Sequence, residues 1–234
     1  KWTQGLIWLE ALGKALADDE AALEALYAAL PGESVTLRVF NLSIARQLYA
    51  YARTASPAKR AGWANNLAVA FGCAGDREAA CERAQEAVEL YHQLAAQLPE
   101  AFQAGLAMSL NTLANVLSDL GQHEAACKSA QEAVELRRQL AAQRPEMFQA
   151  DLARSLIVLA LCTEHTDSPS AAVGLAREAV ATLSPAFIRY PAAHGGLLAA
   201  MLGVYLRLCA LAEQQADVDL LMPLLPYLTS EEQD

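Results

Sequence analysis

Apolar residues recur every three or four positions along most of the chain, the pattern of helices that bury one face. The first segment carries Leu6, Leu9 and Leu16 at this spacing, and Asp19 then offers a helix start. A further stripe follows over residues 35–55 and ends before Pro57. Alanine and leucine dominate the composition and β-branched residues are scarce, so we expect an all-α protein without a sheet.

Part of the sequence occurs twice. Residues 75–114 and 121–160 are identical at 28 of 40 positions, with a period of 46 residues. A unit that recurs at fixed spacing stacks on its neighbours to bury its apolar face, so this period predicts an α-solenoid of antiparallel helix pairs. A third copy has diverged but stays in register. Its Ala172, Ala176 and Val180 follow Ala126, Ala130 and Val134 by 46 residues.

The repeat also suggests an organisation of the chain into three parts. Residues 1–58 form N-terminal helices, divergent or capping, and residues 59–212 form the repeat array. Residues 213–234 form a C-terminal cap and a polar tail, because Pro223 and Pro226 exclude a long regular helix there. We expect about ten helices in all. Their breaks are predicted at Pro31, Pro57, Gly75, Pro99, Gly121, Pro145, Asp167 and Pro191.

The net charge of the chain limits the classes of molecule that it can bind. A formal net charge of -10 disfavours nucleic acid and anionic lipid, since both require a basic surface. No apolar run approaches the length of a membrane span, so we expect no membrane association. The five cysteines are odd in number and form no CxxC pair, which favours a reducing compartment, the cytoplasm. We expect all five to be small apolar fillers.

One segment departs from this acidity. Between residues 34 and 75 there is no acidic residue, whereas Arg38, Arg46 and Arg53 lie in the predicted helix 35–55. This asymmetry indicates either a docking surface for an acidic partner or an ordinary solvated face.

The sequence shows no motif of an enzyme. The four histidines form no HExxH, and no glycine-rich phosphate loop is present. Cys162, His165 and Asp167 have the spacing of metal ligands but span a predicted helix end, so we interpret their spacing as accidental. We therefore expect no catalytic residue, no cofactor and no metal site.

The second copy carries the pattern L-x2-L-A-x2-L-x3-G-x4-A-x6-A, which resembles the tetratricopeptide repeat (TPR). The residues are Leu110, Leu113, Ala114, Leu117, Gly121, Ala126 and Ala133. The family's usual unit is shorter, about 34 residues, so this chain is similar to the long-helix repeats of kinesin light chains and of large bacterial signalling proteins. The resemblance implies a right-handed superhelix in which the first helix of each pair lines a concave groove.

The resemblance also implies which residues face the groove. Asn65, Asn111, Asn115 and Arg154 are the predicted partner-binding residues, since asparagine both donates and accepts hydrogen bonds with an extended peptide. Further groove positions are Val69, Met108, Asp119, Ile157 and Leu161. Glu82, Glu86 and Glu89 are predicted to lie on the opposite, solvated face.

The predicted function is therefore protein–protein interaction. We expect the chain to be the partner-binding or sensing arm of a larger bacterial signalling protein that holds a protein or peptide in its groove. The alternative is a structural or assembly scaffold that mediates self-association.

Overall fold

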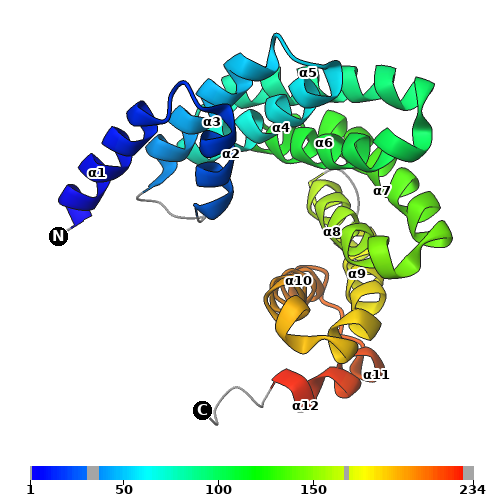
Figure 1. Ribbon diagram of the computed structural model, residues 1–234. Coiled ribbons are helices and arrows are strands. Elements are labelled where there is room, and N and C mark those ends of the chain that lie inside the picture. The colour runs from blue at the N-terminus through cyan, green and yellow to red at the C-terminus, as the bar shows by residue number, and fades with distance from the viewer. Residues whose placement is uncertain (1, 31–36, 166–168, 229–234) are drawn as a thin grey trace. The chain divides into compact units, whose positions relative to one another are not determined.

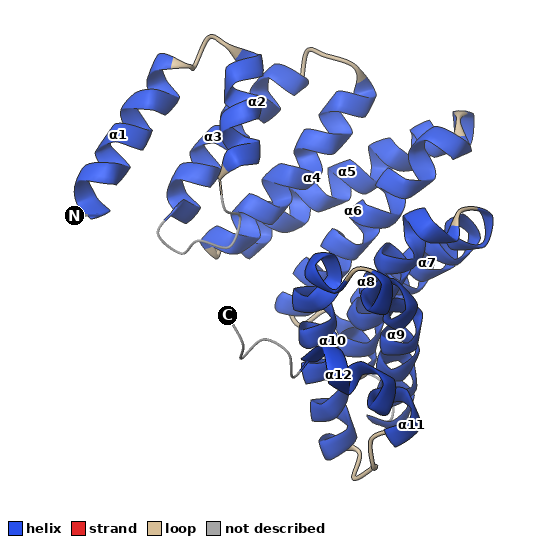
Figure 2. Cartoon of the chain, turned by 60° about the horizontal axis from the view of Figure 1, so that its bottom comes forward, coloured by secondary structure: helices blue, strands red, loops and turns tan. Residues whose placement is uncertain are grey.

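The computed structural model describes residues 2–30, 37–165 and 169–228, and every regular element in these ranges is a helix (Figures 1 and 2). The predicted all-α fold is therefore confirmed. The helices are α1 (Trp2–Ala15), α2 (Glu20–Ala29), α3 (Arg38–Ala52), α4 (Pro57–Ala74), α5 (Arg77–Gln97), α6 (Pro99–Asp119), α7 (His123–Gln143), α8 (Pro145–Thr163), α9 (Pro169–Arg189), α10 (Pro191–Leu211), α11 (Val218–Leu221) and α12 (Leu225–Leu228), with a 3-10 turn, η2, at Met222–Leu224.

Local sequence explains where these helices begin and end. Ser56 caps α4 by accepting a hydrogen bond from the Lys59 backbone N–H at 3.3 Å, and Pro57 takes the first helical position. Gly75 ends the same helix with a φ of 89°, a left-handed conformation that favours glycine. Gly121 has a φ of 74° at the equivalent turn of the next copy.

Three further predicted breaks, like Pro57, are proline positions that start a helix. Pro99, Pro145 and Pro191 each stand at the first position of a helix, where the missing N–H costs no hydrogen bond. The predicted breaks at Pro31 and Asp167 lie outside the described residues. Pro185 lies inside α9 without ending it.

The chain folds into two compact units, residues 1–120 and residues 121–234. In the first unit α3, α4, α5 and α6 pack in succession, each against the next. In the second unit α7, α8, α9 and α10 do the same. Each copy of the repeat therefore contributes a first helix (α4, α6, α8 or α10) and, for the first three, a long second helix (α5, α7 or α9).

Alanines line the helix crossings. Ala126, Ala130 and Ala133 on α7 are completely buried, as are Ala153 and Ala160 on the helix that follows. Small side chains at these positions let two helix backbones approach closely, while leucines fill the space around them. The family motif thus marks close-packed positions.

The N-terminal helices have a core of their own. Leu23, Ile44 and Leu48 are fully buried and pack with Trp63 of α4. The Trp63 ring meets Tyr27 edge to face, with 5.2 Å between the ring centroids. Helices α2 and α3 are therefore anchored to the repeat array through α4.

The C-terminal segment closes the second unit as short helices. Leu224 is fully buried, and the Asp217 backbone N–H donates a hydrogen bond to the Tyr205 hydroxyl at 2.9 Å. Arg177 Nε donates to Asp217 Oδ2 at 2.7 Å, which fastens this segment to α9. The prediction that residues 217–228 form no long regular helix is confirmed.

Helices α9 and α10 test the expectation that no segment of the chain is long and apolar enough to span a membrane. By length and composition α9 and α10 meet the criterion for a membrane span, so the expectation that no segment approaches that length is wrong. Core helices of soluble proteins meet the same criterion. Here α9 packs against both α8 and α10.

Candidate partner-binding surface

One face of α6 stays uncovered in the first unit. Met108 is 41% exposed, and Asn115 and Asp119 are exposed at the next turns of the same face, with Asn111 half-buried between them. Residues separated by three, four or seven positions share a helix face, so these four form one stripe. We call Met108, Asn111, Asn115 and Asp119 the α6 stripe. The structure thus brings Asn111 and Asn115 together, one turn apart.

Asn65 is more deeply buried than Asn111, the residue that follows it by one repeat of 46 residues. Its side chain is only 3% exposed, and its Oδ1 has no hydrogen-bond partner among the described residues. The reason is packing, since α4 contacts α3, α5 and α6 and position 65 lies among these helices. The exposed face of α4 runs instead through Val69, which is 46% exposed. A role for Asn65 in partner binding stays a prediction.

Arg154 belongs to α8 in the second unit, and its side chain is 59% exposed. Its Nη1 lies 3.5 Å from Asp151 Oδ1, one turn earlier on the same helix. Asp151 also faces the buried Arg137, with 3.1 Å between Oδ2 and Nη1. An exposed pair at 3.5 Å contributes about 0.3–0.5 kcal/mol at most, so Arg154 remains available to a ligand.

The glutamates of α5 that were predicted to be solvated differ in exposure. Glu86 was expected to be solvated, but its side chain is 14% exposed. It accepts hydrogen bonds from Tyr49 of α3 at 2.6 and 2.7 Å and from Arg60 Nε of α4 at 2.6 Å, and it pairs with Arg83. Partial burial and the Glu86 carboxylate raise the pKa of Tyr49. Glu86 therefore ties three helices together, whereas Glu82 and Glu89 are exposed.

Cys162, which shares a metal-ligand spacing with His165 and Asp167, is also a poor nucleophile. Burial, with Cys127 beside it, raises the pKa of the Cys162 thiol to about 12, so the thiolate is scarce at neutral pH. Asp167, the third residue with metal-ligand spacing beside Cys162 and His165, lies outside the described residues. No group of three potential metal ligands occurs among the residues that the structure describes. The prediction that all cysteines are buried fillers is wrong for Cys73, which is exposed.

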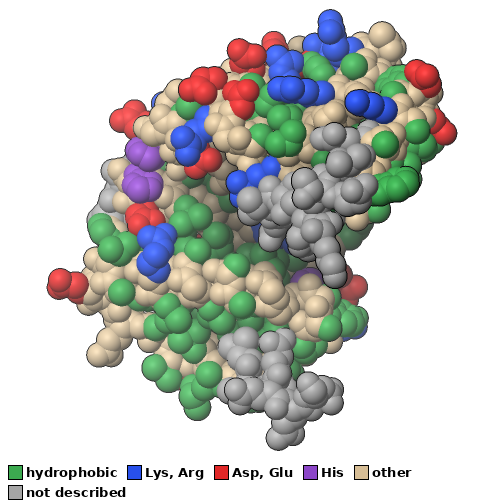
Figure 3. Space-filling view, turned by 90° about the vertical axis from the view of Figure 1, so that its left-hand side faces the viewer, with side chains coloured by type: hydrophobic (Ala, Val, Ile, Leu, Met, Phe, Trp, Pro, Cys, Tyr) green, Lys and Arg blue, Asp and Glu red, His purple; other side chains and the backbone are tan. Residues whose placement is uncertain are grey.

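Sequence reasoning missed a histidine pair. The rings of His123 and His165 stack with 4.3 Å between their centroids, at the start of α7 and just after α8. They line a surface cavity of about 630 Å³ together with Lys128 and Gln122. Histidine side chains lie side by side at the surface in Figure 3. The two residues are 42 positions apart in the sequence, so only knowledge of how the helices stack pairs them.

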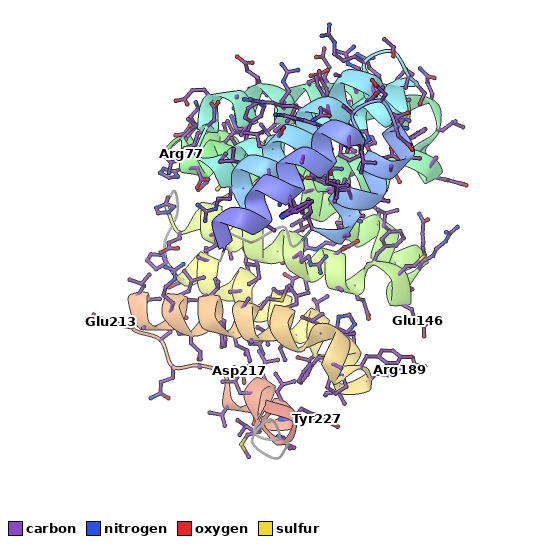
Figure 4. All side chains as sticks on the ribbon, turned by 60° about the vertical axis from the view of Figure 1, so that its left-hand side comes forward. Arg77, Glu146, Arg189, Glu213, Asp217 and Tyr227 are labelled. Atoms are coloured by element: carbon purple, nitrogen blue, oxygen red, sulfur yellow. The ribbon has the colours of Figure 1, made fainter. Side chains whose placement is uncertain are left out.

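A second cavity, of about 440 Å³, lies where α8 begins and α9 ends. Its lining includes Gln149, Tyr190 and His194, and Arg189 bridges its rim to Glu146 at 3.1 Å. Figure 4 shows Glu146 and Arg189 at the same edge of the second unit. Both partners are largely exposed, so the pair adds little stability.

Comparison with known proteins identifies repeats in part of the chain. The family model of the tetratricopeptide repeat matches residues 60–95 and 106–142. Among solved structures, a Podosopora anserina protein with kinesin light chain nearly identical TPR-like repeats superposes with a TM-score of 0.61. The two are 17% identical over 94% of this chain and 98% of that one.

BtubC (BKLC) from P. vanneervenii superposes with a TM-score of 0.55, at 18% identity over 92% of this chain and 91% of that one. Among curated protein sequences none matches. Helices α5, α6 and α7 are each 21 residues long, in keeping with a long repeat. The two matched segments are tetratricopeptide repeats, and the chain has the fold of the long-helix repeats seen in kinesin-light-chain-like proteins.

Proposed function

We propose that the chain holds a protein or peptide partner on the exposed face of its first helices. Tetratricopeptide repeats are in general protein-interaction modules, and the α6 stripe is the observation that carries this proposal. It places two asparagines one turn apart between an exposed methionine and an exposed aspartate. The exposed Asn115 side chain can pair with both the N–H and the C=O groups of an extended peptide, whereas the Oδ1 of Asn111 is buried. Methionine adapts to varied apolar side chains. Arg154 lies on α8 in the second unit, and its part in binding is a prediction of its own.

The test is a triple alanine variant at Asn111, Asn115 and Arg154. Binding to a partner isolated by pull-down is expected to weaken by about tenfold or more, because each lost polar contact costs about 0.5–1.5 kcal/mol. The matched control replaces Glu82, Glu89 and Gln93, three exposed polar residues of α5, and is expected to bind like the parent. Equal affinity of the two variants contradicts the proposal.

Asn65 requires a separate variant. Because its side chain is buried, Asn65→Ala reports on packing as well as on binding. A loss of affinity without a change in the melting temperature assigns Asn65 to the binding surface, and a lower melting temperature alone assigns it to the core.

We place this interaction module in the cytoplasm, as the partner-binding or sensing arm of a larger bacterial signalling protein. The similarity of the repeat to long-helix repeats supports the assignment, and so do the five free cysteines, which suit a reducing compartment. The reading frame of the complete gene tests it, since a signalling domain on the same polypeptide is required.

Self-association is a second candidate function, favoured by the C-terminal helices. Val218 is 65% exposed, Met222 58% and Leu225 46%. Terminal units of repeat arrays usually present a polar outer face, so these apolar side chains indicate a contact surface. Sedimentation of the parent and of a Val218→Ser, Met222→Ser variant decides the matter. A monomeric parent excludes this function, and an oligomer dissolved by the two serines supports it.

A further inference from the structure

The cavity where α8 begins and α9 ends is a second candidate site, separate from the α6 stripe. Its volume is about 440 Å³, within the range of about 300–1,000 Å³ that is typical of small-molecule pockets. The lining comes from the start of α8, the end of α9 and the start of α10, and all of it belongs to the second unit.

Two lining residues are smaller than the residues at the same positions of the earlier copies. Ala186 lies 46 residues after Leu140, and His194 lies 46 residues after Phe148. The first copy also has a leucine and a phenylalanine there, Leu94 and Phe102. Leu140 is 6% exposed, so a leucine at this position packs against its surroundings. Leucine reduced to alanine leaves a space where the surroundings do not collapse, and the third copy therefore lacks apolar volume that the other two supply.

The apolar part of the lining suits an aromatic ring. Ala150, Pro185 and Ala186 are apolar, and the Tyr190 side chain, which lines the same cavity, is 55% exposed. Arg189 lies over the Tyr190 ring, 5.4 Å from its centroid. Aromatic rings attract one another in offset and edge-to-face contacts, so an aromatic occupant gains more from the tyrosine than an aliphatic occupant of equal size.

The polar part of the lining indicates a neutral occupant with a hydrogen-bonding group. Gln149 and His194 are half-buried, and their side chains form no hydrogen bond within the described part of the chain. Each can both donate and accept. Arg189 and Glu146, labelled in Figure 4, compensate each other's charge across 3.1 Å. The lining therefore has no unbalanced charge while His194 is neutral.

We propose that this cavity binds a small, neutral aromatic molecule that carries a hydrogen-bonding group. The ring takes the space that leucine and phenylalanine side chains fill in the other copies and contacts Ala186 and Tyr190. The hydrogen-bonding group reaches Gln149 and His194. Cavities left by a missing leucine side chain bind aromatic rings, because the ring buries apolar surface that water would otherwise cover.

Phenol is the probe, because it joins an aromatic ring to one hydroxyl, and cyclohexanol is its saturated control. Ligand-observed NMR measures the affinity, and the ring-proton signal of His194, assigned by its loss in His194→Phe, locates the site. We expect phenol to bind with a dissociation constant of about 5 mM or tighter and to shift the His194 signal. Cyclohexanol is expected to bind about fivefold more weakly or less well still.

Two variants restore the residues of the second copy, Ala186→Leu alone and Ala186→Leu with His194→Phe. Because the new side chains fill a cavity, both variants are expected to keep or raise the melting temperature of the parent. Both are expected to weaken phenol binding by at least about tenfold. The matched control Ala181→Leu adds the same side chain at an exposed position of α9 and is expected to stay within about twofold of the parent.

Three results overturn the proposal. The first is a phenol titration that does not shift the His194 signal, and the second is equal affinity of the filled and the control variants. The third is a lowered melting temperature of Ala186→Leu, because position 186 is then closely packed and offers no space. Alanines at Asn111, Asn115 and Arg154 leave phenol binding unchanged, so failure here is distinct from failure of the α6 stripe.

Discussion

Arg137 and Asp151 form an ion pair between α7 and α8, with 3.1 Å between Nη1 and Oδ2, at positions where the preceding copy has Tyr91 and Gly105. The Arg137 side chain is 7% exposed, and burial lowers the pKa of its guanidinium. Asp151 supplies the opposite charge that a buried cation requires. The third copy has Leu183 and Leu197 at these positions, so one site of the repeat uses three different chemistries.

This relationship predicts that a second substitution at Arg137 compensates for the loss of Asp151. Asp151→Leu leaves Arg137 without its carboxylate and is expected to lower the free energy of unfolding by about 1–3 kcal/mol. The double variant Arg137→Leu, Asp151→Leu copies the third repeat and is expected to recover most of that loss. Urea unfolding measures both variants. A double variant less stable than the single one contradicts this account.

The contact between Gly105 and Tyr91 occupies the equivalent position in the first unit and can also be tested by substitution. An added Cβ would lie 2.5 Å from Tyr91 Cε1, closer than side chains tolerate, so the ring must move. Gly105→Ala is therefore expected to cost about 1–3 kcal/mol by overpacking, despite the better helix propensity of alanine. Gly174 of α9 has open space at its Cβ position, and Gly174→Ala is expected to gain about 0.5–1 kcal/mol. Thermal melts that rank the two variants the other way refute the assignment.

The close packing of alanines gives a second overpacking test. Ala126 is fully buried at a helix crossing, while Ala142 is exposed on the same helix. Ala126→Leu is expected to lower stability by about 1–3 kcal/mol, and Ala142→Leu to change it by less than about 0.5 kcal/mol. Denaturant midpoints compare the two directly, and similar midpoints rule out the proposed crossing.

Glu164 and Arg207 predict a dependence on pH. Two hydrogen bonds from Arg207, at 2.6 and 2.8 Å, lower the pKa of the Glu164 carboxyl below its ordinary value. A lowered folded-state pKa stabilises the fold above the unfolded pKa of about 4.3, and this stabilisation is lost as the pH falls through the folded-state value.

Unfolding of the parent and of Glu164→Gln at about pH 7 and about pH 3 tests this dependence. We expect the parent to exceed the variant by about 1 kcal/mol or less at the higher pH, and the difference to shrink at the lower one. A difference that persists in acid means that Glu164 acts through packing alone.

The cysteines are expected to differ in reactivity. Cys73 is exposed, whereas burial raises the pKa of Cys162 to about 12. Cys162 is therefore almost entirely protonated at about pH 8, so a thiol-reactive disulfide reagent is expected to modify Cys73 first. Cys162 should react only when the chain is unfolded. Replacing Cys73 by serine should remove the fast phase, and a fast phase that survives disproves the assignment.

Several features of the fold were readable in the sequence because they repeat. Two copies related by a period of 46 residues must place equivalent residues alike, so Gly121 could be assigned a turn and Ala126 a crossing. Asn65 shows the limit of this reasoning. Its equivalent Asn111 is half-buried, but Asn65 is covered, because the helices that pack around α4 differ in sequence from those of the later copies.

Pairs between helices were the features that the sequence did not reveal. The network of Glu86 with Tyr49 and Arg60 joins three helices, and the stacked His123 and His165 come from successive turns of the second unit. The periodicity of one helix predicts the direction in which a side chain points. It does not predict which residues of neighbouring helices lie opposite, so Glu86 was predicted to be solvated.

Because the two copies are nearly identical, their helices could pair wrongly during folding. The pairs Tyr91 with Gly105 and Arg137 with Asp151 oppose such mispairing. Adjacent units of almost the same sequence can dock in the wrong order or exchange helices between molecules, a common failure of repeat proteins. A helix carrying Tyr91 in place of one carrying Arg137 would remove the interhelical ion pair with Asp151. Arg137 opposite Gly105 would in turn lose its carboxylate. Each second helix therefore matches the first helix of the copy that follows it, and a misassembled chain is destabilised when these helices pack.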